Sequence, residues 1–416
     1  MRVLLHPIDG CALVAASLVV PVGWRHDPLG LEGLAHLAEH GHFLGSESYP
    51  DADAVTRPFG THLDGRALAD VTTYHFTCLR EHAAPMLDLL RDVVFRPTFD
   101  RQRLAHEREI VRSAMLVESE FAPWEWAALK VDDILFEIDG LASLGTPSSF
   151  ARLARRHLLD WQARHYRPEA CCLLLAGDSA AIGALEGGAG GRGPAAKGAA
   201  DEGPLPPPVA RTVHERAYRR HHPDQSPEMC LGFRFPLTAF GPAVELLRVL
   251  LGNYPGSRLW RRFRDEEAIA YTVDASLRLL ADGGRLNLYV GVADVVPPER
   301  AWQALVALVR ELRDAGPTPD EVEWARRVAR LDLHRHMLDP ERALSFLVSR
   351  YSCLAARPAA EGGPYGALMA GLEREDHLGV AHAAREVLAG PAAALGVVGN
   401  VGDWSLTDAL EALPGV

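Results

Sequence analysis

Cysteine is scarce in this chain, and its thiols are poorly placed for a disulfide framework. Only 6 of the 416 residues are cysteine. None are paired at the C-x-x-C spacing of redox or zinc-ribbon motifs. Disulfide scaffolds are dense in cysteine and belong to oxidising compartments, so this composition favours a reducing compartment, and we expect a cytoplasmic protein. The six are Cys11, Cys78, Cys171, Cys172, Cys230 and Cys353.

Long apolar runs are also missing. The apolar run Cys11–Val22 is too short to cross a bilayer, which takes about 20 residues. It follows a turn-forming Asp9-Gly10 pair, and Arg2 is the one basic residue before it, so it reads poorly as a secretory signal. We expect a buried strand over Leu13–Val22 and no association with a membrane.

Positive charge is in short supply. The chain has 43 Lys and Arg against 55 Asp and Glu, and its net charge is -12. Nucleic-acid binding requires clustered Lys and Arg, so no nucleic-acid partner is expected. The acidic balance leaves room for a preference for basic peptides. A chain of this length suffices for two domains of about 200 residues, each with a substantial core.

One short segment does gather groups that can hold a metal. His36, Glu39 and His40 form an H-x-x-E-H pattern. Residues four apart share one face of a helix, so both imidazoles can bind one ion. This order reverses the H-E-x-x-H zincin motif and is itself a metalloprotease signature. In such sites zinc polarises a water and the scissile carbonyl, and the carboxylate takes the proton of the water.

The residues around the motif carry a family resemblance. With Pro28–Ala35 before it and Phe43–Ser46 after it, the segment resembles the M16 peptidases, the family of pitrilysin, insulin-degrading enzyme and mitochondrial processing peptidase. The resemblance implies a Zn²⁺ cofactor held by His36 and His40, with Glu39 as the catalytic base. It also implies that peptide substrates bind as an added β-strand.

The resemblance continues along nearly the whole chain. Arg264 and Tyr271 fall at positions that in the family contact substrate. Asp64-Gly65 departs from the family, where Asn-Ala is usual. The matching segments are Gly60–Gly65, Asp70–Tyr74, Leu144–Thr146, His165–Pro168 and Ser257–Tyr271.

The third zinc ligand of the family has no direct counterpart. The family places a Glu seven residues after the first Glu of a later helix, and here Ala114 stands at that position. Glu118 lies four residues on, on the same face of a continuing helix, and we assign it as the third ligand. Val117–Glu120 also resembles the Val-Asp-Ser-Glu that carries the ligand in the pitrilysin branch, and Glu120 is the alternative ligand. A two-histidine site stays open as well.

Glu107 and His42 each admit a role at the metal site and a plainer structural role. The resemblance implies that Glu107 orients a zinc-bound histidine, and the plainer reading is a solvated helical face. His42 lies six residues after His36, about 120° away on a helix, so core packing or support is favoured over metal binding.

The chain divides at a change in composition. Residues 183–210 are rich in Gly and Pro and predict a linker between an N-terminal domain, 1–182, and a C-terminal domain, 211–416. Cys172–Asp178 and Leu395–Asp403 both read as a buried strand stopped by a Gly turn. This repeat predicts an α+β fold of two duplicated domains, each a mostly antiparallel sheet with helices on one face. Thr318–Glu321 is a capping box that opens a helix to about Met337.

Three classes of function fit these observations. The first is a zinc endopeptidase that cleaves extended peptides inside a two-subunit chamber, with peptide maturation as one use. The second is a non-catalytic M16-like subunit of a heterodimeric peptidase, which Ala114 favours. The third is a metal enzyme of altered chemistry on the same scaffold. The chain's length resembles half of the long family members, which implies a homodimer or a heterodimer with a related chain.

Overall fold

The computed structural model describes the chain in two compact units. The described residues are 1–115, 122–138, 145–189, 216–252, 254–351 and 363–413. The first unit consists of 1–119, 141–209 and 335–349, and the second of 120–140, 210–334 and 350–416. No helix in the described part of the chain combines the length and apolar character needed to cross a membrane.

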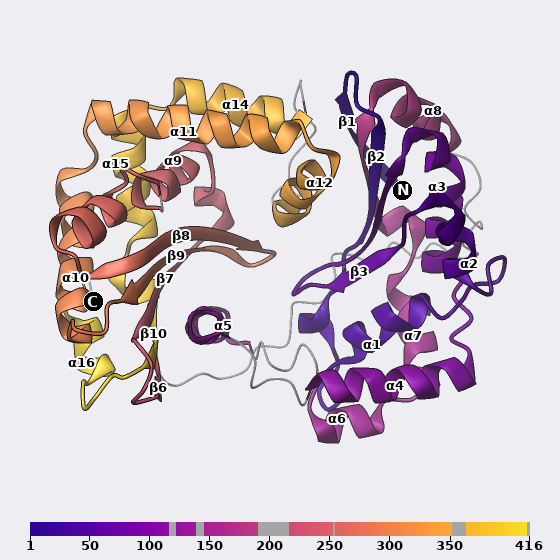
Figure 1. Cartoon of the computed structure of the whole chain (residues 1–416), viewed down its shortest axis with the longest axis horizontal. Helices are drawn as coiled ribbons and strands as arrows, with labels where there is room; N and C mark the ends of the chain where they lie inside the picture. Colours follow the sequence, from indigo (N-terminus) through magenta and orange to yellow (C-terminus); the bar gives the residue numbers. More distant parts are fainter. Residues whose placement is uncertain (116–121, 139–144, 190–215, 253, 352–362, 414–416) are drawn as a thin grey trace. The chain divides into compact units, whose positions relative to one another are not determined.

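A five-stranded sheet forms the centre of the first unit (Figure 1). Its β1 and β5 run parallel, and the other neighbouring pairs are antiparallel. Apolar and β-branched residues fill β2, and every one from Val14 to Val20 is buried, as suits a strand covered on both faces. In spatial order the strands are β1 (Arg2–Ile8), β5 (Cys172–Asp178), β2 (Leu13–Val20), β4 (Thr72–Leu79) and β3 (Asp64–Ala67).

Helices cover both faces of this sheet. α3 packs on β2 and β4, and α8 packs on β1 and β5, whereas α12 packs on β2 and β5 from the other side (Figure 1). The helices of the unit are α1 (Leu34–His42), α2 (Ala52–Thr56), α3 (Ala83–Phe95), α4 (Arg101–Met115), α6 (Pro147–Arg152), α7 (Arg155–His165), α8 (Ser179–Ala189) and α12 (Pro340–Ser349).

The second unit repeats the strand order of the first. Its β6 and β10 are parallel, and its other neighbouring pairs are antiparallel. In spatial order the strands are β6 (Ala217–His221), β10 (Ala393–Gly399), β7 (Glu228–Phe235), β9 (Gly283–Val292) and β8 (Ala270–Leu280). The helices are α5 (Pro123–Phe136), α9 (Pro242–Leu251), α10 (Pro298–Ala315), α11 (Pro319–Met337), α14 (Gly363–Arg374), α15 (His377–Val387) and α16 (Leu406–Glu411), with a π-helical turn η8 (Trp260–Glu266).

Each unit contains one helix from the other half of the sequence. α5 precedes the predicted linker, yet it packs on β7 and β10 of the second unit. Its Asp132 is buried between Arg278 and Arg285, at 2.6 and 2.7 Å. α12 follows the linker and packs on the first sheet. Sequence order alone therefore does not divide the chain into its compact units.

The structure confirms the predicted fold class and corrects one detail of the linker. Two duplicated domains with mostly antiparallel sheets are present, and α5 and α12 add a helix to the second face of each sheet. Residues 183–189, which we assigned to the linker, continue α8. Because most of 183–210 lies outside the described residues, the predicted domain bounds stay a prediction. The strand expected over Leu13–Val22 ends at Val20, and the helix expected to Met337 does end there.

Candidate metal centre

The metal-binding motif lies on the short helix α1, whose start is fixed by a buried carboxylate. Asp27 accepts hydrogen bonds from the backbone N–H groups of Gly33 and Ala35, at 2.7 and 2.9 Å. These are donors that a helix N-terminus leaves without intrahelical partners. Gly33 is in the left-handed region, with φ of 89°, which glycine adopts without strain. The Asp27 carboxylate thus anchors the first turn of α1.

One side of α1 packs into the core and leaves the motif on the other. Leu34, Leu37 and Ala38 are buried in the cluster around the first sheet. Gly41 allows close packing, since a Cβ there would lie 2.9 Å from the Phe99 ring and 3.2 Å from Leu158. The helix therefore cannot rotate without breaking this packing, and the 3.6-residue repeat directs the motif residues to a common stripe.

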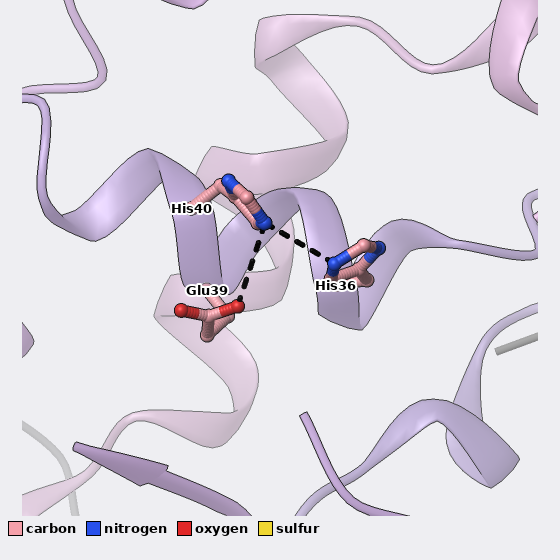
Figure 2. Close-up of side chains that lie close together, drawn as sticks. All are labelled: His36, Glu39 and His40. Carbon is pink, nitrogen blue, oxygen red and sulfur yellow. Dashed lines mark hydrogen bonds and ion pairs between the residues drawn. The ribbon is translucent and has the colours of Figure 1, made fainter. Parts of the chain in front are cut away.

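The two motif histidines converge on one point. His36 Nε2 and His40 Nε2 lie 3.1 Å apart, and Glu39 Oε2 is 3.9 Å from His40 Nε2 (Figure 2). Two nitrogens bound to one tetrahedral zinc at about 2.05 Å would be separated by about 3.3 Å. One ligand atom from each of the three residues lies within 4.8 Å of the others. The donor set and its spacing fit a zinc ion.

Glu107 of α4 fixes the tautomer of His40. Its Oε1 lies 2.8 Å from His40 Nδ1, so the ring donates Nδ1–H to the carboxylate and presents the lone pair of Nε2 to the ion. This contact is the geometric basis for the role that the resemblance implies for Glu107, which stays a prediction. His36 Nδ1 is buried without a hydrogen-bond partner among the described residues.

Burial shapes the charges of the site. Desolvation, together with a smaller effect of the nearby His40, lowers the pKa of His36 to about 4, so this imidazole is neutral at pH 7 and able to bind a metal. Desolvation raises the pKa of Glu39 to about 7, with Asp64 and Glu107 acting in the same direction and His40 opposing. A carboxylate with a pKa near neutrality is a suitable general base.

Glu39 lies against the edge strand β3. A Cβ at Gly65 would lie 2.5 Å from Glu39 Oε1, so the carboxylate occupies space that glycine leaves open. This gives a physical reason for the departure at Asp64-Gly65. β3 ends the order β1-β5-β2-β4-β3, and one side of it has no strand partner in the described part of the chain. An extended peptide could add to that side.

Arg264 and Tyr271 lie together in the second unit. The Arg264 guanidinium is 4.2 Å from the Trp260 ring centroid and 4.7 Å from that of Tyr271. Its Nη1 donates to the Tyr271 carbonyl at 3.4 Å, and Tyr271 is 76% exposed. Sequence reasoning gave Trp260 no role, although an aromatic residue four positions before an Arg on a helix is a usable signal. Action of this pair on a substrate held at Glu39 stays a prediction.

The third-ligand candidates lie outside the described residues. This holds for both Glu118 and Glu120, so neither assignment is tested. Ala114 belongs to the last turn of α4. His42 is fully buried, and its ring nitrogens contact Ala38, Tyr74 and Gln162.

We predict that Glu107→Ala weakens zinc binding about 10- to 100-fold, the usual cost of losing a carboxylate that orients a ligand histidine. The dissociation constant can be measured by competition with a chromophoric chelator. Glu109→Ala is the matched control, because Glu109 is on the same helix and pairs with Arg112 on the surface. Equal affinity in the two variants would show that Glu107 does not support the site.

Comparison with protein families identifies both halves of the chain. Residues 2–124 match the model "Insulinase (Peptidase family M16)", and residues 152–328 match "Peptidase M16 inactive domain". The first match contains the histidine motif, and the second contains Arg264 and Tyr271. The resemblance seen in the sequence is thereby confirmed.

Individual relatives agree with this result. The uncharacterized zinc protease YmxG of Bacillus subtilis is 27% identical over 70% of this chain and 71% of its own length. Coenzyme PQQ synthesis protein F of Pseudomonas aeruginosa is 29% identical over 76% of this chain, which spans 39% of that relative.

Solved structures share the fold. A protease from Helicobacter pylori superposes with a TM-score of 0.78 over 95% of this chain and 96% of its own, at 14% identity. The periplasmic protease PqqL of Escherichia coli has a TM-score of 0.74, at 16% identity, over 99% of this chain and 47% of its own. At such identities the likeness concerns the fold.

Proposed function

We propose, since this chain belongs to the M16 family of peptidases, that it is a zinc-dependent endopeptidase that cleaves peptides bound in extended form. The observation that carries the proposal is the convergence of His36 Nε2 and His40 Nε2 at 3.1 Å beside the Glu39 carboxylate. Two half-buried imidazole nitrogens that face each other beside a buried carboxylate form the donor set that zinc prefers.

Each residue of the centre has a role in this proposal. His36 and His40 hold the ion, and Glu107 keeps His40 in the required tautomer. Zinc bound there would acidify a water and polarise the scissile carbonyl. Glu39 would act as the general base toward an attacking water and would return the proton to the leaving amine, and its pKa of about 7 suits both transfers.

The peptide is proposed to lie along β3. An added strand binds through main-chain hydrogen bonds, which do not depend on its side chains. A peptide bound in this way could hold its scissile bond beside Glu39 whatever its sequence. Arg264 and Tyr271 are proposed to contact substrate, as the family resemblance implies. Peptide maturation is one use that we propose for this cleavage.

A second chain is proposed to complete the enzyme. This chain covers 39% of the Pseudomonas aeruginosa relative and 47% of PqqL, so two copies approach the length of one long relative. We propose a homodimer, or a heterodimer with a related M16 chain, that encloses the peptide in a chamber. The low cysteine content supports action in the cytoplasm.

We propose Glu118 as the third zinc ligand, and this assignment makes a prediction. Glu118→Ala should weaken zinc binding far more than Glu120→Ala, and Ala114→Glu should tighten it. If α4 continued past Met115, residues 114 and 118 would share one stripe of the helix, and residue 120 would lie off that stripe. Zinc titration of the three variants checks this. An equal zinc affinity in wild type and Glu118→Ala would remove Glu118 from the site.

The substitution at Ala114 supports a second candidate function. A chain without a third ligand could act as the non-catalytic subunit of a heterodimeric peptidase, or as a metal enzyme of altered chemistry. The experiment that separates these readings measures zinc per chain and cleavage of an unstructured peptide mixture, with and without chelator. An endopeptidase holds zinc and loses cleavage on chelation. Stable zinc without cleavage, even with a related M16 chain added, would contradict the proposed activity.

A further inference from the structure

We propose that a buried hydrogen-bonded column, formed by His42, Tyr74, Tyr166 and Gln162, positions α1 so that Glu39 faces β3. The four residues come from three elements: His42 from α1, Tyr74 from β4, and Gln162 and the C-cap residue Tyr166 from α7. The proposal rests on the metal centre proposed above and assigns positioning roles to residues that touch neither ion nor substrate.

His42 is the central member of the column. Its side chain is fully buried at the last residue of α1. Its Nε2 lies 2.8 Å from Gln162 Oε1, and Gln162 Nε2 donates to the Val94 carbonyl at 2.9 Å. Because the amide nitrogen is used on Val94, the amide oxygen must accept from His42 Nε2–H. This bond ties the end of α1 to α7 and α3.

The other side of the ring reaches the sheet. With its proton on Nε2, the neutral His42 ring accepts at Nδ1, and the Tyr74 hydroxyl donates to it at 3.0 Å. That hydroxyl is 2.9 Å from the Tyr166 hydroxyl. The ring also stacks on Tyr166, with centroids 4.6 Å apart and planes inclined by 22°. Directional bonds therefore join α1 to β4.

The column meets the strand that supports Glu39. Tyr74 pairs across the sheet with Gly65 of β3, the residue against which the Glu39 carboxylate lies. A shift of α1 along β4 would thus change the distance from Glu39 to β3. Apolar contacts tolerate such a shift, because they are non-directional, whereas hydrogen bonds weaken steeply with misalignment. The column thus adds directional restraints to those that core packing places on α1.

The test compares His42→Leu with wild type in the full-length protein. Leucine keeps an apolar side chain in the space and removes both ring nitrogens. With Co²⁺ in place of zinc, the visible absorption spectrum reports ligand geometry at His36 and His40. We expect a changed spectrum and a fall of up to about 100-fold in kcat, the scale of a misplacement of about 1 Å, with a smaller change in KM. Tyr74→Phe, which removes one hydroxyl, should also change the Co²⁺ spectrum and lower kcat.

Ile182→Ala is the control, since Ile182 is a buried residue of α8 outside the column. It should lower Tm without altering the Co²⁺ spectrum. This result would separate an effect on the stability of the unit from an effect on the position of α1. His42→Gln retains a donor and an acceptor and should recover part of kcat.

The outcomes distinguish this inference from the proposed function. Wild-type Co²⁺ spectra and kcat in both His42→Leu and Tyr74→Phe would overturn the positioning role while leaving the metal centre intact. A wild-type protein that binds no Co²⁺ or zinc would overturn the metal centre and the column's role with it. If His42→Leu fails to fold, Tyr74→Phe decides the question.

Discussion

Glu39→Gln is expected to abolish peptide cleavage and leave zinc binding unchanged. The amide preserves the shape of the side chain and loses the basic oxygen that takes a proton from water. General bases contribute about 100- to 10,000-fold, so the loss in kcat should fall in this range. Steady-state cleavage of a fluorogenic peptide, with zinc content measured on the same sample, checks both parts of the expectation.

The control for this variant is Glu109→Gln, because Glu109 is an exposed carboxylate of the first unit. It should cleave at the wild-type rate. A fall of only a few-fold in Glu39→Gln would show that another group takes the proton. Loss of zinc in that variant would instead place Glu39 among the ligands.

His36→Ala and His40→Ala are each expected to release zinc. Each variant removes a nitrogen from a buried site, and water is a poor substitute for an imidazole whose ring is already oriented. The loss should exceed the roughly 100-fold that the removal of an orienting carboxylate can reach. Zinc per chain after dialysis, and the dissociation constant by chelator competition, measure the effect.

His382→Ala provides the comparison for these two variants, since His382 is an exposed histidine of the second unit. It should retain full zinc. Retention of zinc at wild-type affinity in either motif variant would exclude that histidine as a ligand and contradict the site.

The spacing of residues close together in the sequence predicted the parts of the structure that one helix or one turn determines. His36, Glu39 and His40 lie within four positions of one another, so the helical repeat alone brings them together. The helix from Pro319 likewise follows from its capping residues, since Thr318 and Glu321 bond each other's backbone N–H groups. The duplicated strand order extends the repeat that the two Gly-stopped strands had indicated.

Contacts between distant residues could not be predicted in this way. Glu107 and His40 are 67 positions apart, and His42 and Gln162 are 120 apart, so no local pattern joins them. Only the family resemblance indicated the first pair. An apolar stripe shows that a helix buries one face and does not show which sheet receives it, so the placement of α5 and α12 was not predicted. The glycines of 183–189 favoured a linker over a helix, so the C-terminal part of α8 was not predicted. Ile182 and Leu185 of this helix are buried.

The most direct test of the metal centre is anomalous diffraction at the zinc edge from crystals of the wild-type protein grown with equimolar zinc. The proposal predicts a strong peak about 2.0–2.1 Å from both His36 Nε2 and His40 Nε2, with Glu39 beside it and a carboxylate from 116–121 as the third protein ligand. A peak at these nitrogens without that carboxylate would favour a two-histidine site. The absence of any peak at the two nitrogens in zinc-loaded crystals would contradict the central claim.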